Sequence, residues 1–575
     1  MRVTIDGIVT EVEQGTTILN AAKKVGIKIP TLCYHPDQDV KANCRICVVE
    51  VEGQRVLQPA CAFPCSDGMV VHTNTERVRK ARKTILELIL SHHKQDCLHC
   101  ARNHNCELQE IAADLGFTGD YRFPIHLRGN GEIDISSPSV VRDPGKCIAC
   151  NRCVWACEKF QSVNALCRKN RGFETYISTN FDIPLGNSVC VGCGQCVQAC
   201  PVGALTIHDD TEDAWKAIED KNKVVAAQVA PAVRVNIAEA LGEEPGTIST
   251  GRLVTAMKMI GIDYVFDTDF TADLTIMEEG TEFINRLTQG GVLPLITSCS
   301  PGWVKFCETF YPDQLAHLSS AKSPQGMFGA IIKEWFSKKI NKTPQEVYSL
   351  SIMPCTAKKY ERTRPELGRN GYQDIDCVLT VQELAKMIRQ ANIDFSKLPE
   401  TEFDKPFGLG SGAGVIFGAT GGVMEAALRS VYEIVTGKTL ENIDFKAVRG
   451  LNGTREATVQ VGDIAVKVCI TSGLDNARKI MELVRAGKAD YHFIEVMACP
   501  GGCIGGGGNA YRNWSKVEKR NEATYIVDAK HCPIRQSHKN PAIAEFYADL
   551  GVKPGEGIAH KLFHTSYTDR GNLTR

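Results

Sequence analysis

The chain lacks the features that would place it in a membrane or on a polyanion. No uninterrupted apolar run reaches the roughly 20 residues of a transmembrane helix. The first residues alternate like a strand and lack the apolar core of a signal peptide. The formal net charge is only −1, which gives no electrostatic argument for binding nucleic acid or an anionic membrane. The sequence therefore predicts a cytoplasmic protein with no membrane span and no nucleic-acid partner.

Cysteine, by contrast, is abundant. The 575 residues include 25 cysteines, and 17 of these precede residue 201. In a long cytosolic chain, cysteines at this density indicate metal ligands rather than disulfides. The length suggests about four domains, and an apolar content of 43% is enough for ordinary globular cores.

The first cysteine group follows a small mixed β segment. Two alternating runs within 2–12 surround Asp6-Gly7, which predicts a hairpin, and 17–25 has the pattern of a short helix. The spacing that follows resembles the ferredoxin-like two-iron domain at the start of the large peripheral subunit of respiratory complex I. A zinc site that uses the same four thiolates is the alternative. The predicted ligands are Cys33, Cys44, Cys47 and Cys61.

The second group contains a histidine. Apolar residues at helical spacing predict a helix over 76–91, which leads directly to the histidine. One imidazole and three thiolates suit either a four-iron cluster or a zinc ion, and the neighbouring cysteine groups favour iron. The predicted ligands are His93, Cys97, Cys100 and Cys106.

Two copies of the bacterial ferredoxin run form the strongest local signal. In such pairs the fourth cysteine of each run binds the cluster of the other run. Two zinc ribbons are the alternative. The predicted ligand sets are Cys147, Cys150, Cys153 with Cys200, and Cys190, Cys193, Cys196 with Cys157.

After residue 210 the pattern changes to alternating strands and helices. Three predicted strands run directly into cysteines, at Cys299, Cys355 and Cys499. Strands that deliver ligands at their C-terminal ends, with helices between them, are typical of open α/β sheets. The predicted strands are 224–229, 264–266, 293–298, 348–353 and 492–497, with a helix at 251–260.

Three motifs in this region carry the functional signal. They are Thr-Ser-Cys-Ser-Pro-Gly-Trp at 297–303, Met-Pro-Cys-Thr-Ala-Lys-Lys at 353–359, and Glu-Val-Met-Ala-Cys-Pro-Gly-Gly-Cys-Ile followed by four glycines at 495–508. Together they resemble the signature motifs of the FeFe (iron-only) hydrogenases. The N-terminal cysteine groups resemble those of the modular members of that family. The fold class implied is a multidomain α+β protein with a large α/β catalytic domain.

The resemblance implies an H-cluster, in which a four-iron cubane is bridged to a di-iron unit with CO, cyanide and azadithiolate. Cys503 matches the bridging ligand, and Cys355 and Cys499 match cubane ligands. Ser300 stands at the position of a fourth cysteine, and Cys299 at the position of a proton relay. A serine oxygen is a harder, poorer ligand for iron than a thiolate. Ser300 or water completes the cubane, or Cys299 moves in as ligand, or the cluster is labile.

Further site residues follow from the same resemblance. Lys358 matches a residue that hydrogen-bonds a cyanide, and the residues around the di-iron unit match Ala230, Pro231, Met353, Pro354, Phe417, Met497, Gln325 and Ser323. The implied proton chain runs through Cys299, Glu279, Ser319, Glu282 and Arg286. Without the motifs, the cluster of Glu278, Glu279 and Glu282 would favour a solvated acidic helix face.

The predicted domains are 1–78 (two-iron), 79–125 (the four-iron cluster with one histidine ligand), 126–209 (two-cluster ferredoxin) and 210–575 (catalytic, with a C-terminal wrap). The implied cofactors are one 2Fe-2S cluster, three 4Fe-4S clusters and the H-cluster. The implied function is reversible oxidation of dihydrogen, with electrons passed to ferredoxin or to flavin- and NAD(P)-binding partner subunits. No nucleotide site is visible, because Gly412-x-Gly414-x3-Gly418 has its third glycine one place late for a dinucleotide fingerprint. A non-catalytic electron-transfer, sensory or biogenesis relative is the alternative.

Overall fold

The computed structural model describes residues 1–119, 122–129, 131–451, 453–511 and 513–571. Its first unit is a five-stranded sheet in the order β2-β1-β5-β3-β4, with β1 and β2 as the antiparallel hairpin predicted around Asp6-Gly7. Helix α1 (Ile18–Lys24) begins at Thr17, whose side chain accepts a hydrogen bond from Asn20 N. The strands are β1 (Arg2–Ile5), β2 (Ile8–Glu11), β3 (Val48–Val51), β4 (Gln58–Pro59) and β5 (Met69–His72).

Helix α2 (Glu76–Leu90) confirms the helix predicted over 76–91. Thr75 caps it by accepting a hydrogen bond from Val78 N, and an apolar stripe that includes Leu86 is buried. The helix ends just before His93, so it sets the position of the imidazole at the edge of the next unit. Helix α3 (Glu107–Asp114) follows the cysteines of that group.

The tandem cysteine runs form a compact unit with two short helices, α4 (Arg152–Trp155) and α5 (Gln195–Ala199). The unit also contains two antiparallel strand pairs, and the strand after the second cysteine run begins at Leu205. The pairs are β6 (Val140–Arg142) with β9 (Leu205–Ile207), and β7 (Leu166–Lys169) with β8 (Tyr176–Thr179).

The catalytic region contains two four-stranded sheets. The first, β11-β10-β13-β16, is parallel throughout, and the second, β12-β19-β18-β17, is parallel except for β17. The strand predicted at 293–298 is shortened to two residues, and the other predicted strands match closely. The bounds are β10 (Val224–Val229), β11 (Tyr264–Asp267), β12 (Leu295–Ile296), β13 (Val347–Met353), β16 (Cys377–Thr380), β17 (Thr454–Val461), β18 (Ile464–Ser472) and β19 (Phe493–Met497).

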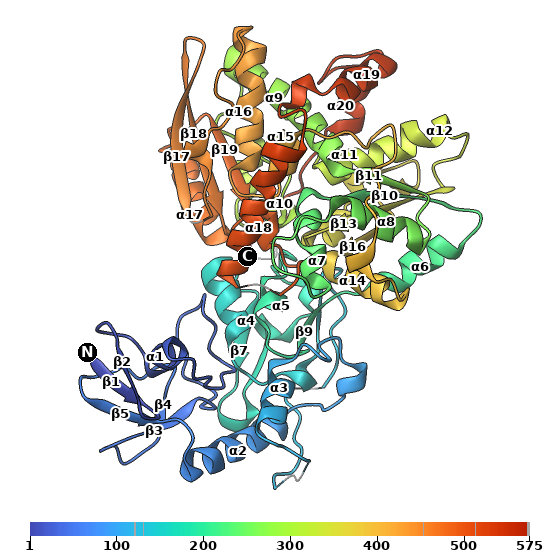
Figure 1. Ribbon diagram of the computed structural model, residues 1–575. Coiled ribbons are helices and arrows are strands. Elements are labelled where there is room, and N and C mark those ends of the chain that lie inside the picture. Colours follow the sequence, from blue (N-terminus) through green and yellow to red (C-terminus); the bar gives the residue numbers. More distant parts are fainter. Residues whose placement is uncertain (120–121, 130, 452, 512, 572–575) are drawn as a thin grey trace.

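Helices cover both sheets, and α9 (Thr268–Gln289) packs against α11, α15 and α16. Figure 1 shows the N-terminal units at one end of the molecule and the two sheets at the other. The larger helices are α6 (Thr211–Glu219), α8 (Thr250–Ile260), α10 (Pro301–Phe310), α11 (Pro324–Ile331), α13 (Ala357–Glu361), α14 (Val381–Gln390), α15 (Gly412–Ile416), α16 (Gly422–Thr436), α17 (Leu474–Arg485), α18 (Trp514–Ile526), α19 (Pro541–Leu550) and α20 (Gly557–Phe563).

The two-cluster unit contacts the catalytic region directly. Gln198 Nε2 donates to the carbonyl oxygen of Gly507 at 3.1 Å, and Thr356 Oγ1 donates to Gly192 O at 2.7 Å. A Cβ on Gly507 would lie 2.5 Å from Cys193 O, so only glycine allows this approach of the two backbones. The glycine run after Cys503 therefore serves the contact between units.

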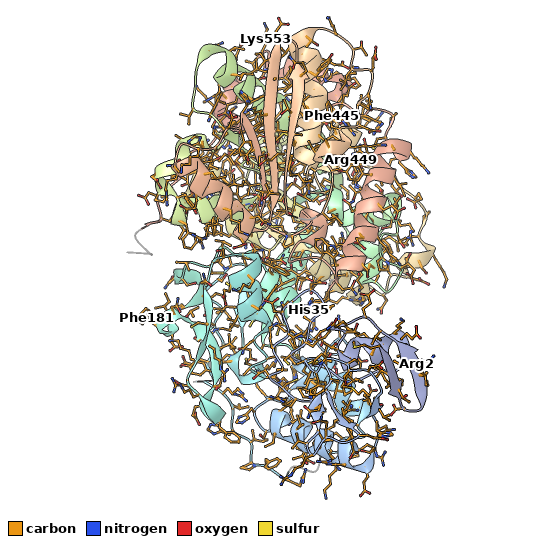
Figure 2. All side chains as sticks on the ribbon, turned by 90° about the vertical axis from the view of Figure 1, so that its left-hand side faces the viewer. Arg2, His35, Phe181, Phe445, Arg449 and Lys553 are labelled. Carbon is orange, nitrogen blue, oxygen red and sulfur yellow. The ribbon has the colours of Figure 1, made fainter. Side chains whose placement is uncertain are left out.

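The first unit joins the two-cluster unit through the segment that carries His35, which lies near their junction in Figure 2. Arg152 is buried there and donates to Tyr34 O at 2.5 Å, and Trp155 donates to Asp39 at 2.8 Å. Within the described ranges, no helix is both long enough and apolar enough to cross a bilayer.

Candidate functional site

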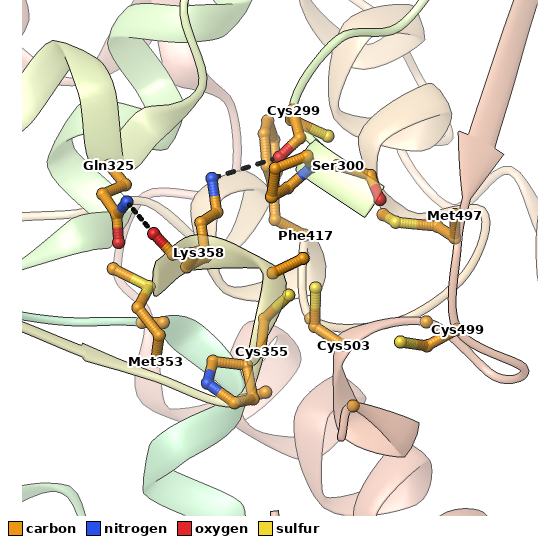
Figure 3. Close-up of a pocket in the computed structure, with 18 of the residues that line it drawn as sticks. Cys299, Ser300, Gln325, Met353, Cys355, Lys358, Phe417, Met497, Cys499 and Cys503 are labelled. Atoms are coloured by element: carbon orange, nitrogen blue, oxygen red, sulfur yellow. Dashed lines mark hydrogen bonds between the residues drawn. The ribbon is translucent and has the colours of Figure 1, made fainter. Parts of the chain in front are cut away.

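A cavity of about 80 Å³ lies between the two catalytic sheets, where the C-terminal ends of β10, β12, β13 and β19 deliver their loops. Its wall is almost entirely apolar (Figure 3). An apolar wall excludes water and strengthens the few polar interactions inside it. The predicted site residues that line it are Ala230, Pro231, Cys299, Ser300, Gln325, Met353, Pro354, Cys355, Lys358, Phe417, Met497, Cys499 and Cys503.

Five cysteines line this cavity, and three of them, together with one serine, are predicted ligands of the cubane. Cys355, Cys499 and Cys503 all line it, together with Ser300 (Figure 3). Burial raises the pKa of Cys503 to about 12 and also raises that of Cys355. Thiols in such a place become thiolates only beside a strong positive charge, such as iron. The donor set therefore fits a metal cluster.

Ser300 begins helix α10 but does not cap it with its side chain. Its Oγ instead accepts a hydrogen bond from Ala498 N at 3.3 Å, which joins the first motif to the third. Ser300 also lines the cavity that the three predicted thiol ligands line.

Lys358 reaches the cavity wall from α13. Its Nζ donates to Ser323 Oγ at 2.7 Å and to Cys299 O at 3.2 Å, and it forms an ion pair with Glu361 at 2.8 Å (Figure 3 shows the contact with Cys299). A buried ammonium group requires such compensation. The sequence reasoning missed Glu361, because nothing in the motif distinguishes it from an exposed helix residue.

Gln325 supplies a polar group without a complete set of partners. Its Nε2 donates to Glu361 at 2.9 Å and to Lys358 O at 3.3 Å, whereas its Oε1 is buried and accepts no hydrogen bond among the described residues. Buried polar atoms are normally paired. An orphan atom at the wall of this cavity fits the presence of a bound polar group, and the H-cluster that the motifs imply would supply one.

The predicted proton chain lies beside Cys299. Glu279 is buried, and this burial raises its pKa to about 8, although a hydrogen bond from Ser319 opposes the shift. Ser319 Oγ donates to Glu282 Oε2 at 3.1 Å, and Arg286 pairs with Glu282 at 2.5 Å. The structure therefore links Glu279, Ser319, Glu282 and Arg286 in series and places Cys299 close to Glu279. The solvated acidic face is wrong, because Glu278 and Glu279 are buried away from water.

The His93 group lines a smaller cavity of about 20 Å³ with Cys97, Cys100 and Cys106. His93 Nδ1 lies 2.9 Å from Lys146 O, and burial lowers the pKa of the imidazole, which favours the neutral form that binds metal. A Cβ on Gly203 would lie 2.5 Å from Cys100 Sγ, so glycine leaves the room that this cavity needs.

The tandem runs form two further cavities of about 20 Å³ each. In both, the fourth cysteine comes from the other run, as the ferredoxin pattern predicts. Cys193 lines the second of these cavities and also the large apolar cavity, so the two are adjacent. The lining cysteines are Cys147, Cys150, Cys153 and Cys200 in one cavity, and Cys157, Cys190, Cys193 and Cys196 in the other.

The four predicted ligands of the first unit lie together as two pairs. A hydrogen bond from the Cys44 thiol lowers the pKa of Cys33 to about 6, and one from Cys61 lowers that of Cys47 to about 7. The other three thiols all raise the pKa of Cys61, which shows that the set is close together. Within the described part of the chain, no group of three or more His, Cys, Asp or Glu side chains is arranged around a single-ion position.

Thiol-lined cavities, one of which adjoins an apolar cavity with a buried lysine, indicate an iron–sulfur oxidoreductase. Family models agree along the chain. The matches are a 2Fe-2S iron-sulfur cluster binding domain at 1–76, the NADH-ubiquinone oxidoreductase-G iron-sulfur binding region at 82–119, a 4Fe-4S dicluster domain at 146–204, the C-terminal domain of the iron only hydrogenase large subunit at 223–507 and the iron hydrogenase small subunit at 515–570.

Similarity to known proteins identifies the family within this class of oxidoreductases. The NADP-reducing hydrogenase subunit HndD of Solidesulfovibrio fructosivorans is 47% identical over all of both chains, and iron hydrogenase 1 of Clostridium pasteurianum is 39% identical over 98% of this chain and 99% of its own. Apo [FeFe]-hydrogenase HydA1 of Chlamydomonas reinhardtii has a TM-score of 0.58 at 39% identity, covering 63% of this chain and all of its own. The chain belongs to the iron-only (FeFe) hydrogenase family. It is an enzyme, a hydrogenase whose N-terminal iron–sulfur domains relay electrons.

The raised pKa of Glu279 predicts a pH-dependent stability. Between its ordinary value and about 8, the folded protein holds a proton that the unfolded chain releases, so stability falls as pH rises, by about 1.4 kcal/mol per pH unit. Glu279→Gln removes this loss. Its Tm should exceed that of the parent by a margin that grows by several degrees between about pH 5 and pH 8. The exposed control Glu522→Gln should show a constant difference, and a constant difference for Glu279→Gln as well would contradict the buried proton.

Proposed function

We propose that this hydrogenase is the catalytic subunit of an NAD(P)-linked complex, in which flavin- and NAD(P)-binding partner subunits exchange electrons with its N-terminal clusters. The observation that carries the electron route is Cys193, which lines both the apolar cavity and a ferredoxin-type cavity. The full-length similarity to an NADP-reducing hydrogenase subunit supports the acceptor. Ferredoxin is the alternative acceptor. We further propose a cytoplasmic location and the four-domain division at residues 78, 125 and 209.

The proposed cofactors are one 2Fe-2S cluster, three 4Fe-4S clusters and the H-cluster. Each predicted ligand set meets in the fold, which supports this inventory. The proposed ligands are Cys33, Cys44, Cys47 and Cys61 for the two-iron cluster, His93, Cys97, Cys100 and Cys106 for the next, the two crossed ferredoxin sets, and Cys355, Cys499, Cys503 and Ser300 for the cubane of the H-cluster.

When bound, the H-cluster supplies the iron centre at which dihydrogen and electrons are interconverted. The residues of the chain hold that group and control its surroundings. Lys358, fixed by Ser323 and Glu361, presents an ammonium donor at the cavity wall. Met353, Phe417, Met497 and their apolar neighbours exclude water, which preserves the strength of the lysine's interactions.

Protons follow a separate series of groups. Cys299 lies at the cavity, and burial raises the pKa of its thiol, so the thiol keeps its proton until a base accepts it. Glu279 is suited to that exchange, because its pKa of about 8 lies close to neutral pH. Ser319 then joins Glu279 to Glu282, which Arg286 holds in place near the surface.

A biogenesis role is the second candidate, because cytosolic iron-sulfur assembly component 3 of Bos taurus is 28% identical over 66% of this chain and 82% of its own. That match leaves about a third of this chain uncovered, whereas the hydrogenases match along its whole length. Lys358, Glu279 and Glu282 also have no evident use in a non-catalytic relative. The observations favour catalysis.

The N-terminal third should contain iron and sulfide rather than zinc. Metal and acid-labile sulfide analysis of the anaerobically purified chain should give iron close to the inventory above and little zinc. In Cys100→Ala the cavity of the His93 group loses a ligand, and the iron content should fall by about one four-iron cluster. Cys167→Ala, at a cysteine outside all the predicted sets, is the control and should keep its iron. Stoichiometric zinc would refute the cluster assignment.

The hydrogenase site is tested by infrared spectroscopy in the CO and cyanide stretching region, together with a hydrogen-evolution assay. Protein coexpressed with the dedicated maturases should show the bands and evolve hydrogen. Lys358→Ala should lose at least about a hundredfold in turnover while the N-terminal clusters keep their spectra, since it removes a charged donor from an apolar site. Lys386→Ala, which breaks an exposed pair with Asp209, is the control. Undiminished turnover in Lys358→Ala would show that its assigned role is wrong.

Ser300 is the position where an oxygen stands in the ligand set. An oxygen ligand changes the charge and the hydrogen bonding around a cluster, which set its potential. Ser300→Cys should therefore increase iron retention on dilution, turnover, or both, and shift the reduction potential of the cubane. The control Ser298→Cys alters a neighbouring serine whose hydroxyl is bonded to Ala321 O. Identical iron content, potential and turnover in Ser300→Cys and the parent would make Ser300 a competent substitute.

A further inference from the structure

The C-terminal tail inserts a histidine into the network around Glu282. His564 follows helix α20 and forms an antiparallel bridge with Ala321. The backbone N–H of Thr565 donates to Ser320 O at 2.8 Å. The tail is thereby fixed against the loop that carries Ser320.

Both ring nitrogens of His564 have partners. Nδ1 lies 2.8 Å from Ser320 Oγ, and Nε2 lies 3.0 Å from Glu278 Oε2. The Ser320 hydroxyl donates in turn to Glu282 Oε2 at 3.1 Å. The imidazole is therefore separated by a single hydroxyl group from the carboxylate in the middle of the proposed proton route.

The other side of His564 is a carboxylate that water cannot reach. Glu278 is fully buried and accepts hydrogen bonds from the Tyr547 hydroxyl and from Gly555 N, the latter at 2.7 Å. A buried carboxylate is costly without a compensating positive charge, and an imidazolium at His564 supplies one. An imidazole can gain or release a proton at either ring nitrogen, so this side chain can pass a proton to a hydrogen-bonded neighbour.

His564 lies at the boundary with solvent. The side chain of His564 is 7% exposed to solvent. The exposed His560 stacks on it, with 4.4 Å between the ring centroids. The ionisable groups on the elements packed around it are Glu278, Glu282 and Arg286 of α9, Lys322 of the adjoining loop, Tyr547 of α19, His560 of α20, and Tyr567 of the tail.

Arg286 cannot exchange protons with Glu282 as His564 can. Its guanidinium forms an ion pair with Glu282, but arginine stays protonated in proteins and neither releases nor accepts a proton in the working range. It can hold Glu282 in place without exchanging protons. A group that does titrate is needed close to Glu282, and His564 is connected to it by two hydrogen bonds.

We propose that His564 exchanges protons with Glu282 through the hydroxyl of Ser320. This inference rests on the proposed function and adds a residue to its proton route. The imidazolium passes its Nδ1 proton to Ser320 Oγ while the Ser320 hydroxyl proton passes to Glu282 Oε2. One N–H and one O–H bond break, and one O–H bond forms at each oxygen, which leaves a neutral imidazole and a protonated carboxyl. Hydrogen oxidation uses the reverse transfer. The C-terminal tail is therefore part of the proton route as well as a cover for the catalytic region.

The test measures kcat for hydrogen evolution against pH in the full-length holoenzyme. His564→Gln should lower kcat roughly three- to tenfold, because direct exchange between Glu282 and water remains. The KM for the electron donor should not change, and the dependence of kcat on pH should flatten, because an imidazole that exchanges protons has been removed. His538→Gln is the matched control, since His538 Nε2 also lies 3.0 Å from a glutamate, Glu433, and it should keep the parent profile.

Chemical rescue separates a relay from a structural role. His564→Ala leaves space for a free imidazole, so added imidazole should restore part of its kcat. The double variant with Ser320→Ala should not be rescued, because the hydroxyl that passes the proton is gone. A loss of the same size at every pH, without rescue, would assign His564 a structural role and overturn the proposal.

A second measurement needs no turnover. The infrared carboxyl band of Glu282, identified by its absence in Glu282→Gln, is titrated in the full chain produced without maturases. Its midpoint should move in His564→Gln and stay unchanged in His538→Gln. An unmoved midpoint overturns the proposal. If the parent holoenzyme evolves no hydrogen, the proposed function fails, and this titration alone decides whether His564 and Glu282 exchange a proton.

Discussion

The catalytic region depends on one constraint, which is that segments far apart in the sequence have to end at one cavity. Parallel strands satisfy it because their C-terminal ends lie at the same edge of a sheet. β10 and β13 bring Pro231 and Cys355 to the cavity from one sheet, and β12 and β19 bring Ser300 and Cys499 from the other. A slip of one residue in any of these strands would turn its side chains to the other face. The paired registers of β10 with β13 and of β18 with β19 therefore fix the ligand geometry.

An apolar cavity also requires every charge near it to be compensated. The two adjacent lysines of the second motif meet this requirement with different carboxylate partners. Lys358 lines the cavity and pairs with Glu361, whereas Lys359 is fully buried behind it and pairs with Asp210 at 2.7 Å and with Glu383 at 2.8 Å. Because Asp210 follows the two-cluster unit directly, Lys359 helps to fix that unit against the second motif. A buried lysine that lost its carboxylates would be strongly destabilising.

Local patterns predicted much of this structure, because the cysteine spacings, helix α2 and most buried strands are set by residues close together in the sequence. The partners of Glu278, by contrast, lie far from it in the sequence. Without the motifs, the three glutamates of α9 favour a solvated face, yet Glu278 meets Tyr547 and His564, which lie 269 and 286 residues later in the chain. The hydrophobic periodicity of a sequence cannot predict contacts between residues so far apart. The short β12 has a simpler cause, since Pro294 has no N–H to extend the strand pairing and the chain must turn toward Cys299.

The same packing that buries the site also keeps the proposed electron route apart from the proposed proton route. Cys193 reaches the cavity wall from the two-cluster unit, and Cys299 reaches it from β12, with apolar side chains such as Met497 lining much of the rest. Fixed polar or sulfur groups therefore meet the cavity at only a few places, and the proposed routes for electrons and protons reach it at different cysteines. The contact at Cys193 depends on the glycine run, because a side chain at Gly507 would push the two backbones apart. The contact at Cys299 depends on a buried carboxyl, Glu279, whose burial keeps it protonated near neutral pH. The exclusion of water from the cavity supports both proposed routes, because the side chains at Cys193 and Cys299 then connect the cavity with the rest of the protein.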